Sequence, residues 1–238
     1  MLTSNRSLMA IACLFMAVAF AVSPYFVQSF SGFDPNQFPV PQDDPPVQPE
    51  GYAFAIWGLI YGWLIIGMGW GLWRAREDAQ WHDMRKPLVI SMAVGAVWLA
   101  VAVASPIWAS VLIWVMLLSA LAALFLAPVA NTTWAAWPVG LYAGWLSAAS
   151  CVSLGLLAAG YGYMSETTAG IVFVALAIVI GSFVQAALGR APTYGIAVIW
   201  ALVAVVVANL ESTPIVAYIA GGGALVMLVP TLQAFRKG

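Results

Sequence analysis

The most informative stretch of this sequence is residues 51–76, GYAFAIWGLIYGWLIIGMGWGLWRAR, which carries no charged residue before Arg74. A helix of this length crosses the hydrocarbon core of a bilayer. Its rings are Tyr52, Phe54, Trp57, Tyr61, Trp63, Trp70 and Trp73, and its glycines are Gly58, Gly62, Gly67, Gly69 and Gly71. A helix made of rings and gaps predicts either close packing against neighbouring helices or a pocket lined with flat aromatic surfaces.

Three of these rings share one face of the helix. Phe54, Trp57 and Tyr61 stand at positions i, i+3 and i+7, which a helix places on one side. Trp57 and Tyr61 are one turn apart, so we expect their rings to stack. Gly58 and Gly62 lie on the adjoining face, where we expect them to let another helix come near.

The composition of the whole chain indicates a polytopic membrane protein. Of 238 residues, 63% are hydrophobic and only 7% are charged, and the mean hydropathy is +0.96. A soluble domain carries about 25% charged residues. The net charge of −1 gives no reason to expect a nucleic-acid partner. Cys13 and Cys151 lie in separate apolar runs, which predicts two buried packing residues rather than a disulfide or metal pair.

The apolar runs predict an all-α bundle of eight transmembrane helices. They cover residues 8–30, 51–73, 87–105, 107–127, 135–158, 168–188, 193–209 and 214–235. We interpret the first run as a retained span rather than a signal peptide because it extends beyond an ordinary signal-peptide core. Residues 31–50 form a proline-rich loop that holds six prolines, four acids and no basic residue. This loop is either a solvated linker or a lid over the mouth of a pocket.

The distribution of Lys and Arg predicts the topology. With eight spans and a cytoplasmic N-terminus, all eight basic residues fall on the cytoplasmic side. The outward segments, which include loop 31–50, contain only acids among their charged residues. We therefore expect an integral protein of the bacterial inner membrane with both termini in the cytoplasm, residues 74–86 as an inner loop, and Trp73, Trp81 and Trp134 as inner interface anchors.

Little in the sequence indicates catalysis. The expected spans contain no ionisable residue at mid-membrane depth, which argues against a proton-coupled pump or a voltage-gated channel. The single histidine, His82, falls in the expected inner loop, and the chain has too few His and Cys residues for a metal centre. No nucleophile or phosphate-binding motif is present. We expect a protein that is not an enzyme, requires no cofactor and binds no metal.

Aromatic residues remain the most distinctive feature of the chain. The candidate pocket wall consists of Phe54, Trp57, Tyr61, Trp98, Tyr142 and Trp145, and the candidate lid is held by Pro45, Pro46 and Pro49. The glycine pairs 58/62, 67/71 and 140/144 have the spacing of close helix contacts. Packing within the bundle and a pocket for a flat or rigid apolar ligand explain these rings equally well.

The same residues resemble a known family. A proline-rich loop with Pro45, Pro46 and Pro49, followed by Phe54, Trp57, Tyr61, Gly67 and Arg74, resembles the TspO/MBR family of tryptophan-rich sensory or translocator proteins. Trp98 with the later Ser105-Pro106-Ile107, and Trp137-Pro138 with Tyr142 and Trp145, resemble its third and fifth helices. The resemblance implies a five-helix bundle over residues 1–160, to which residues 161–238 add three helices.

The resemblance also implies a function. Family members bind porphyrins or sterols, so we expect a tetrapyrrole-like or lipid-like ligand in the aromatic pocket, for transport or for sensory regulation. The expected partners are membrane lipids and this hydrophobic ligand. The alternative is a structural or assembly subunit that packs through its glycine-rich faces, as a homodimer or against a larger membrane complex. We expect helices 6–8 to form a side layer, because residues 168–235 contain only Trp200 of the 12 tryptophans.

Overall fold

The computed structural model describes residues 4–27 and 32–237 of the chain. The helices in this part are α1 (Asn5–Val22), α2 (Ile56–Arg74), α3 (Ala79–Ala104), α4 (Pro106–Leu126), α5 (Ala136–Gly160), α6 (Glu166–Leu188), α7 (Thr193–Asn209) and α8 (Pro214–Lys237). Short 3₁₀ turns cover Ser23–Phe26, Pro35–Gln37 and Gly51–Ala55. No strand occurs in the described residues, and the prediction of an all-α membrane bundle is confirmed.

Helix ends follow from local sequence. The Ser105 side chain accepts a hydrogen bond from the Trp108 N–H, and Pro106 occupies the first position of α4, so α3 and α4 meet with almost no loop. Asp78 caps α3 through the Trp81 N–H. Helix α6 begins after the cap residue Ser165 and ends at Leu188, and the cap residue Gly189 that follows has a left-handed φ of +60°.

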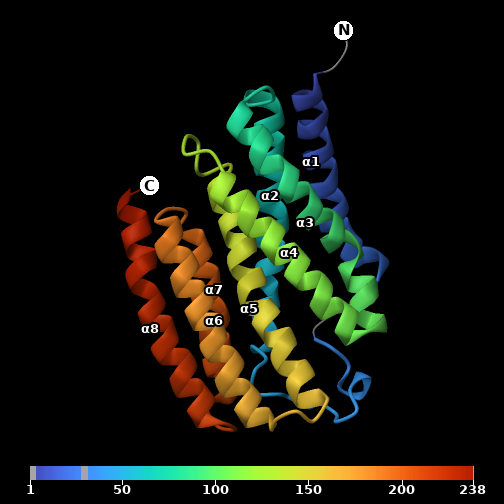
Figure 1. The fold of residues 1–238 in the computed structure, drawn as a ribbon, viewed down its shortest axis with the longest axis vertical. Coiled ribbons are helices and arrows are strands. Elements are labelled where there is room, and N and C mark those ends of the chain that lie inside the picture. Colours follow the sequence, from blue (N-terminus) through green and yellow to red (C-terminus); the bar gives the residue numbers. More distant parts are fainter. Residues whose placement is uncertain (1–3, 28–31, 238) are drawn as a thin grey trace.

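Helices α1 to α5 form a ring, and α6 to α8 form a layer beside it (Figure 1). Within the ring α1 contacts α2 and α3, α4 packs between α3 and α5, and α2 touches α5 lightly. The most enclosed helix is α5, which packs on α4, α6 and α7. Of the residues in its 18-residue apolar segment, 72% are buried. In the other long helices, 28–44% of the corresponding residues are buried. Because α5 contacts α4 on one side and α6 and α7 on the other, it joins the ring to the side layer.

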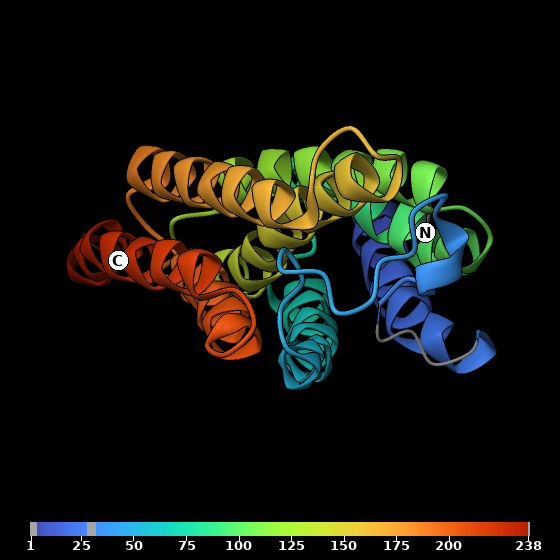
Figure 2. The ribbon, with the colours of Figure 1, turned by 90° about the horizontal axis from the view of Figure 1, so that it is seen from below.

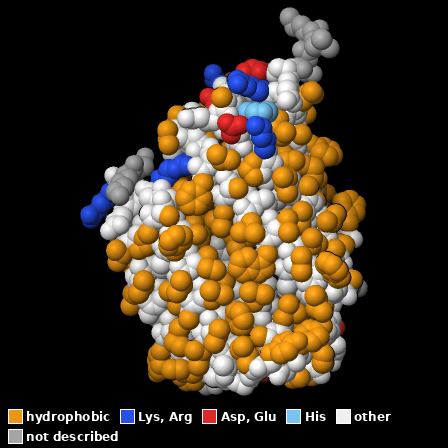
Figure 3. Space-filling view, in the orientation of Figure 1, with side chains coloured by type: hydrophobic (Ala, Val, Ile, Leu, Met, Phe, Trp, Pro, Cys, Tyr) orange, Lys and Arg blue, Asp and Glu red, His pale blue; other side chains and the backbone are white. Residues whose placement is uncertain are grey.

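The two ends of the bundle differ in charge. The described basic side chains lie at the end that holds both termini, which we call the basic end; Figure 3 shows Lys and Arg gathered there above a hydrophobic flank. The opposite end, the acidic end, carries loop 32–50 and the α5–α6 and α7–α8 turns. Its charged residues are Asp34, Asp43, Asp44, Glu50, Glu166 and Glu211.

Within the described residues, seven helical segments are long and apolar enough to cross a membrane, and α7 is a shorter apolar helix of 17 residues. The first segment ends at Phe26, and residues 28–30 of the expected first span lie outside the described residues, as does the beginning of loop 31–50. The second span does not begin as an α-helix at Gly51: a 3₁₀ turn runs to Ala55 and α2 follows.

The expectation of an inner loop over residues 74–86 is largely wrong. Helix α3 begins at Ala79, so His82 and Arg85 lie on a helix. Arg85 is 1% exposed, and its guanidinium donates hydrogen bonds to the carbonyls of Gly71 (2.8 Å) and Ala75 (3.2 Å). It therefore caps the C-terminus of α2. Trp81, expected as an interface anchor, is 1% exposed because it packs against α2.

Candidate aromatic cavity

A cavity of about 370 Å³ lies inside the ring, in the half of the bundle nearer the acidic end. Its wall combines α1, the turn after α1, and α2 to α5. The wall residues are Phe20, Pro24, Tyr25, Phe54, Trp57, Tyr61, Gly95, Trp98, Leu99, Ile113, Met116, Trp145 and Ala149. We call this space the large chamber. Every residue of its wall precedes Gly160 in the chain.

Trp57 and Tyr61 make a continuous flat wall. Their rings stack with centroids 5.3 Å apart and planes 20° apart. Phe20 of α1 meets both rings edge-on, at 5.8 Å from Trp57 and 5.0 Å from Tyr61. These edge-to-face and stacking contacts hold the Trp57 and Tyr61 rings in defined orientations.

Trp145 and Phe54 continue the wall towards α5. Their centroids are 5.8 Å apart in an edge arrangement, and Trp145 also meets Trp57 at 6.3 Å. On the opposite side Trp98 donates a hydrogen bond of 2.8 Å from its indole N–H to the Ala109 carbonyl of α4. This bond satisfies the one polar atom of the ring, so an apolar surface remains for the cavity.

Tyr142 lies behind the wall instead of lining it. The side chain is fully buried, and its hydroxyl is 2.9 Å from Ser91 Oγ, which itself donates to the Met116 carbonyl at 2.8 Å. Its ring supports Phe20, with centroids 5.6 Å apart. The structure therefore places five of the six predicted wall residues around the large chamber, and the sixth as their support.

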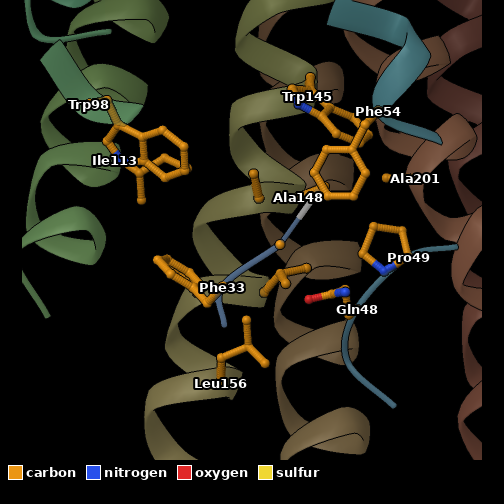
Figure 4. A pocket seen from close by; sticks show the side chains of 14 residues that line it. Phe33, Gln48, Pro49, Phe54, Trp98, Ile113, Trp145, Ala148, Leu156 and Ala201 are labelled. Carbon is orange, nitrogen blue, oxygen red and sulfur yellow. The ribbon is translucent and has the colours of Figure 1, made fainter. Parts of the chain in front are cut away.

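A second, smaller chamber of about 60 Å³ adjoins the first. The two share Phe54, Trp98, Ile113, Trp145 and Ala149. Figure 4 shows Phe33 and Leu156 on one side of this small chamber, with Gln48 and Pro49 on the other. The Gln48 amide points into a space that is otherwise almost wholly apolar. Ala201 of α7 is the only member of the side layer in its described wall.

The proline-rich loop is packed against the bundle along much of its length. Pro45, Pro46, Val47 and Pro49 are buried, and Pro49 lines the small chamber. The Val40 N–H donates to the Gly160 carbonyl at 2.9 Å. Gly155 and Gly160 of α5 leave room for Val47 and Phe38, respectively.

Polar contacts hold the loop to the helices on both sides. Gln37 donates to the Val103 carbonyl of α3 at 2.6 Å, and the Asn209 amide of α7 donates to the Pro46 carbonyl at 2.9 Å. The Glu50 N–H donates to the Ala204 carbonyl at 3.2 Å. These bonds reach α3, α5 and α7 and hold the loop in place, and its residues Phe33, Gln48 and Pro49 line the small chamber.

The glycine pairs behave differently from one another. A Cβ at Gly58 or Gly62 would meet no atom within 4 Å, so no described helix of this chain uses the space that these two glycines leave. Gly67 lies directly against the Trp134 carbonyl, and Gly71 against the Trp81 ring. Gly140 and Gly144 bring α5 against Thr193 and Tyr194 at the start of α7.

Several wall residues were not identified from the sequence. Phe20, Phe33 and Ile113 come from stretches that read as ordinary apolar sequence, and only their position in the fold brings them to the cavity. Gln48 had a usable signal, because it is an uncharged polar residue among the loop prolines. The described residues hold no cluster of three or more His, Cys, Asp or Glu that would bind a metal ion.

Comparison with known proteins identifies the family of this chain. No curated protein and no solved structure matches the chain. The family model described as TSPO-like protein matches residues 6–232, from the start of α1 to the last turns of α8. The match thus includes the three C-terminal helices α6 to α8 together with the ring of helices α1 to α5. This integral membrane protein belongs to the TSPO-like protein family.

Proposed function

We propose that the protein binds an apolar, lipid-like or tetrapyrrole-like molecule in the large chamber, as a step in its transport or its sensing. The single observation that carries this proposal is the chamber itself, about 370 Å³ bounded by Phe20, Trp57, Tyr61, Trp98 and Trp145. Burial of apolar ligand surface there is worth about 25 cal/mol per Å². Each stacked ring pair adds roughly 0.5–1.5 kcal/mol.

The charge distribution favours an uncharged ligand. In the described residues no Asp, Glu, Lys, Arg or His lines either chamber. A carboxylate buried without a basic partner is strongly disfavoured, whereas a hydroxyl or carbonyl group could hydrogen-bond to the Gln48 amide. A sterol-like or lipid-like molecule therefore fits the chambers better than a tetrapyrrole with free carboxylates.

Ligand titrations test the proposal. Quenching of tryptophan fluorescence is measured for full-length protein in nanodiscs with protoporphyrin IX and with its dimethyl ester, and cholesterol is added as a competitor. We expect the ester to bind more tightly than the free acid and cholesterol to displace it. Binding of the ester that is not saturable, or that is unchanged when Trp57 is replaced by Ala, would reject the chamber as the binding site.

A second function has support from one observation. Gly58 and Gly62 form an open strip on α2, which stands out between α1 and the C-terminal helices (Figure 2). Such a strip suits close approach of another transmembrane helix, as in a homodimer or an assembly with a larger complex. If this is the main role, Gly62→Ile should abolish association in cross-linking experiments and leave ligand quenching unchanged.

We further propose that the protein resides in a bacterial inner membrane with its basic end in the cytoplasm. The positive-inside rule supports this orientation, because the basic residues gather at one end. A cysteine at Gln80 should resist an impermeant thiol reagent in intact cells, and one at the exposed Asp43 should react. The opposite pattern of labelling would reverse the orientation.

A further inference from the structure

Two small apolar spaces continue the large chamber towards the side layer. The first is the small chamber of about 60 Å³, which shares five of its wall residues with the large chamber. The second is a space of about 20 Å³ between α5, α6, α7 and the proline-rich loop, which we call the third chamber. It shares Pro49, Ala148, Val152 and Ala201 with the small chamber. The three spaces therefore follow one another from the aromatic ring into the side layer.

The walls of the two small spaces offer hydrocarbon surface. Where the two spaces adjoin, Ala148 of α5 and Ala201 of α7 each contribute only a methyl group (Figure 4). In the described residues no charged side chain lines either space. The Ser153 hydroxyl, which lies in the wall of the small chamber, already donates to the Ser150 carbonyl at 2.9 Å.

Gln48 is the remaining polar side chain of these walls. It borders the small chamber and also an open, polar pocket at the acidic end, together with Glu50 and Ser212. Its amide therefore keeps a polar neighbourhood on the outer side when the small chamber is filled. An apolar group in the small chamber does not leave a buried amide without a partner.

The volumes admit a chain and not a ring system. One water-sized group needs about 10–15 Å³ of such a volume, and a methylene group is of similar size. By that measure the small chamber, of about 60 Å³, holds about four to six carbons of a chain. The third chamber, of about 20 Å³, holds one or two more. A flat ring system has room only in the large chamber, of about 370 Å³.

Empty apolar space inside a helix bundle has a cost. Protein interiors are close-packed, and the atoms around a void lose the dispersion contacts that a filling group would supply. Water gains little from such a void because its walls offer few hydrogen-bond partners. A hydrocarbon chain restores the contacts and needs no hydrogen bond.

We propose that the small and third chambers bind the aliphatic chain of a ligand whose flat ring system occupies the large chamber. This inference rests on the proposed function and narrows its ligand class to ring-bearing lipids with a narrow chain of about six carbons. It also gives the side layer a direct part in binding. Phe173 and Val174 of α6, with Leu202 and Val205 of α7, surround the end of the chain.

The test compares pyrene with 1-butylpyrene, 1-hexylpyrene and 1-dodecylpyrene, on full-length protein in phosphatidylcholine nanodiscs. Energy transfer from tryptophan to pyrene reports binding, and each affinity is corrected for partition of the probe into empty nanodiscs. Ala201→Phe fills the space between the small and third chambers from α7. Val203→Phe is the matched control, because Val203 lies on the same helix and is 41% exposed.

In wild type and in Val203→Phe we expect hexylpyrene to bind about fivefold or more tightly than pyrene, since the enclosed chain makes more contacts than one in fluid lipid. Dodecylpyrene should gain nothing over hexylpyrene. Ala201→Phe should abolish the preference for the chain and change pyrene binding less than about twofold. Saturable pyrene binding that Trp57→Ala weakens, without any effect of chain length, would overturn the chain site and leave the proposed function standing. Absence of saturable binding for all four probes would overturn both.

A photo-cross-linking experiment on the wild type keeps the proposal testable if Ala201→Phe folds poorly. The probe is hexylpyrene with a diazirine at the end of its chain, and cross-linked peptides are identified by mass spectrometry. We expect labelling of the peptides that contain Phe173, Val174, Leu202 or Val205, and its suppression by excess hexylpyrene. Suppressible labelling that is confined to α1 to α4 would overturn the chain site.

Discussion

The two halves of α2 have similar sequences and opposite surroundings. Nearer the acidic end, Trp57 and Tyr61 face a cavity and Gly58 and Gly62 face nothing within 4 Å. Nearer the basic end, Gly67 and Gly71 are pressed against Trp134 and Trp81. The glycine spacing is the same in both halves, so spacing does not decide whether a half is open or closed.

The difference comes from what the other helices present. At the closed half, the first turns of α3 bring Trp81 against Gly71, and Arg85 caps the end of α2. At the open half, Gly95 of α3 lies directly against Phe20 and Met116, and the side chain that α5 presents beyond Trp145 is only that of Ala149. The large rings of the open half pack against one another along the wall, so they enclose a space instead of filling it.

The largest expected effect is a loss of stability in the closed half. Trp81 is 1% exposed and packs on Trp70, with centroids 5.6 Å apart. Trp81→Ala should lower the free energy of unfolding by about 3–5 kcal/mol, because it leaves a void that α2 and α3 cannot close. Thermal melting in detergent, or steric trapping in bicelles, measures this. A loss as small as that of an exposed residue such as Trp73 would contradict the closed-half description.

The open half should show the reverse balance between affinity and stability. Trp57→Ala removes a wall of the large chamber and should weaken ligand binding by about 2–4 kcal/mol, as aromatic hot spots do. Its effect on unfolding should be smaller than that of Trp81→Ala, because the ring borders a space that is already unfilled. Quenching affinity and melting temperature are measured on the same samples. Unchanged ligand affinity together with a lowered melting temperature would mean that Trp57 serves helix packing and not ligand binding.

Two glycines on the same helix make a smaller and sharper comparison. Gly67→Ala places a methyl group on the Trp134 carbonyl and should cost about 1–3 kcal/mol of stability. Gly62→Ala meets open space and should be neutral or stabilising by about 0.5–1 kcal/mol, as for an exposed helix position. Paired melting curves of the two variants decide the matter. Destabilisation by Gly62→Ala would indicate that a partner helix covers the open strip.

The sequence was sufficient to predict the membrane spans and most of the aromatic residues that line the large chamber, because both depend on local patterns. Apolar runs locate the helices, and helical spacing puts Phe54, Trp57 and Tyr61 on one side. It was not sufficient for the glycine pairs, whose roles depend on which helix lies opposite. It also misplaced Arg85 and Trp81, because a charged stretch next to a span reads as a loop, and only the fold shows α3 starting within it.

The smallest effect concerns the turn that follows the closed half of α2. Ser4 and Ser7 of the α1 start donate hydrogen bonds of 2.7 Å to the Glu77 carboxylate, and Arg6 donates to the Glu77 carbonyl at 2.8 Å. The hydrogen bond from Ser4, and then that from Ser7, lowers the pKa of Glu77 below its ordinary value. A lowered pKa means that folding favours the ionised carboxylate, so this contribution to stability exists above the ordinary pKa.

The contribution should disappear as the pH falls through the pKa that Glu77 has in the folded protein. Glu77→Gln should therefore melt below wild type at neutral pH by a small amount, since the group is exposed and screened by solvent. The two melting curves should converge in acid. Asp83→Asn provides the control, because that exposed carboxylate forms its ion pair with Lys86 on its own helix, whereas Glu77 accepts hydrogen bonds from α1. A difference between Glu77→Gln and wild type that persists unchanged into acid would show that the carboxylate charge does not hold α1 to the α2–α3 turn.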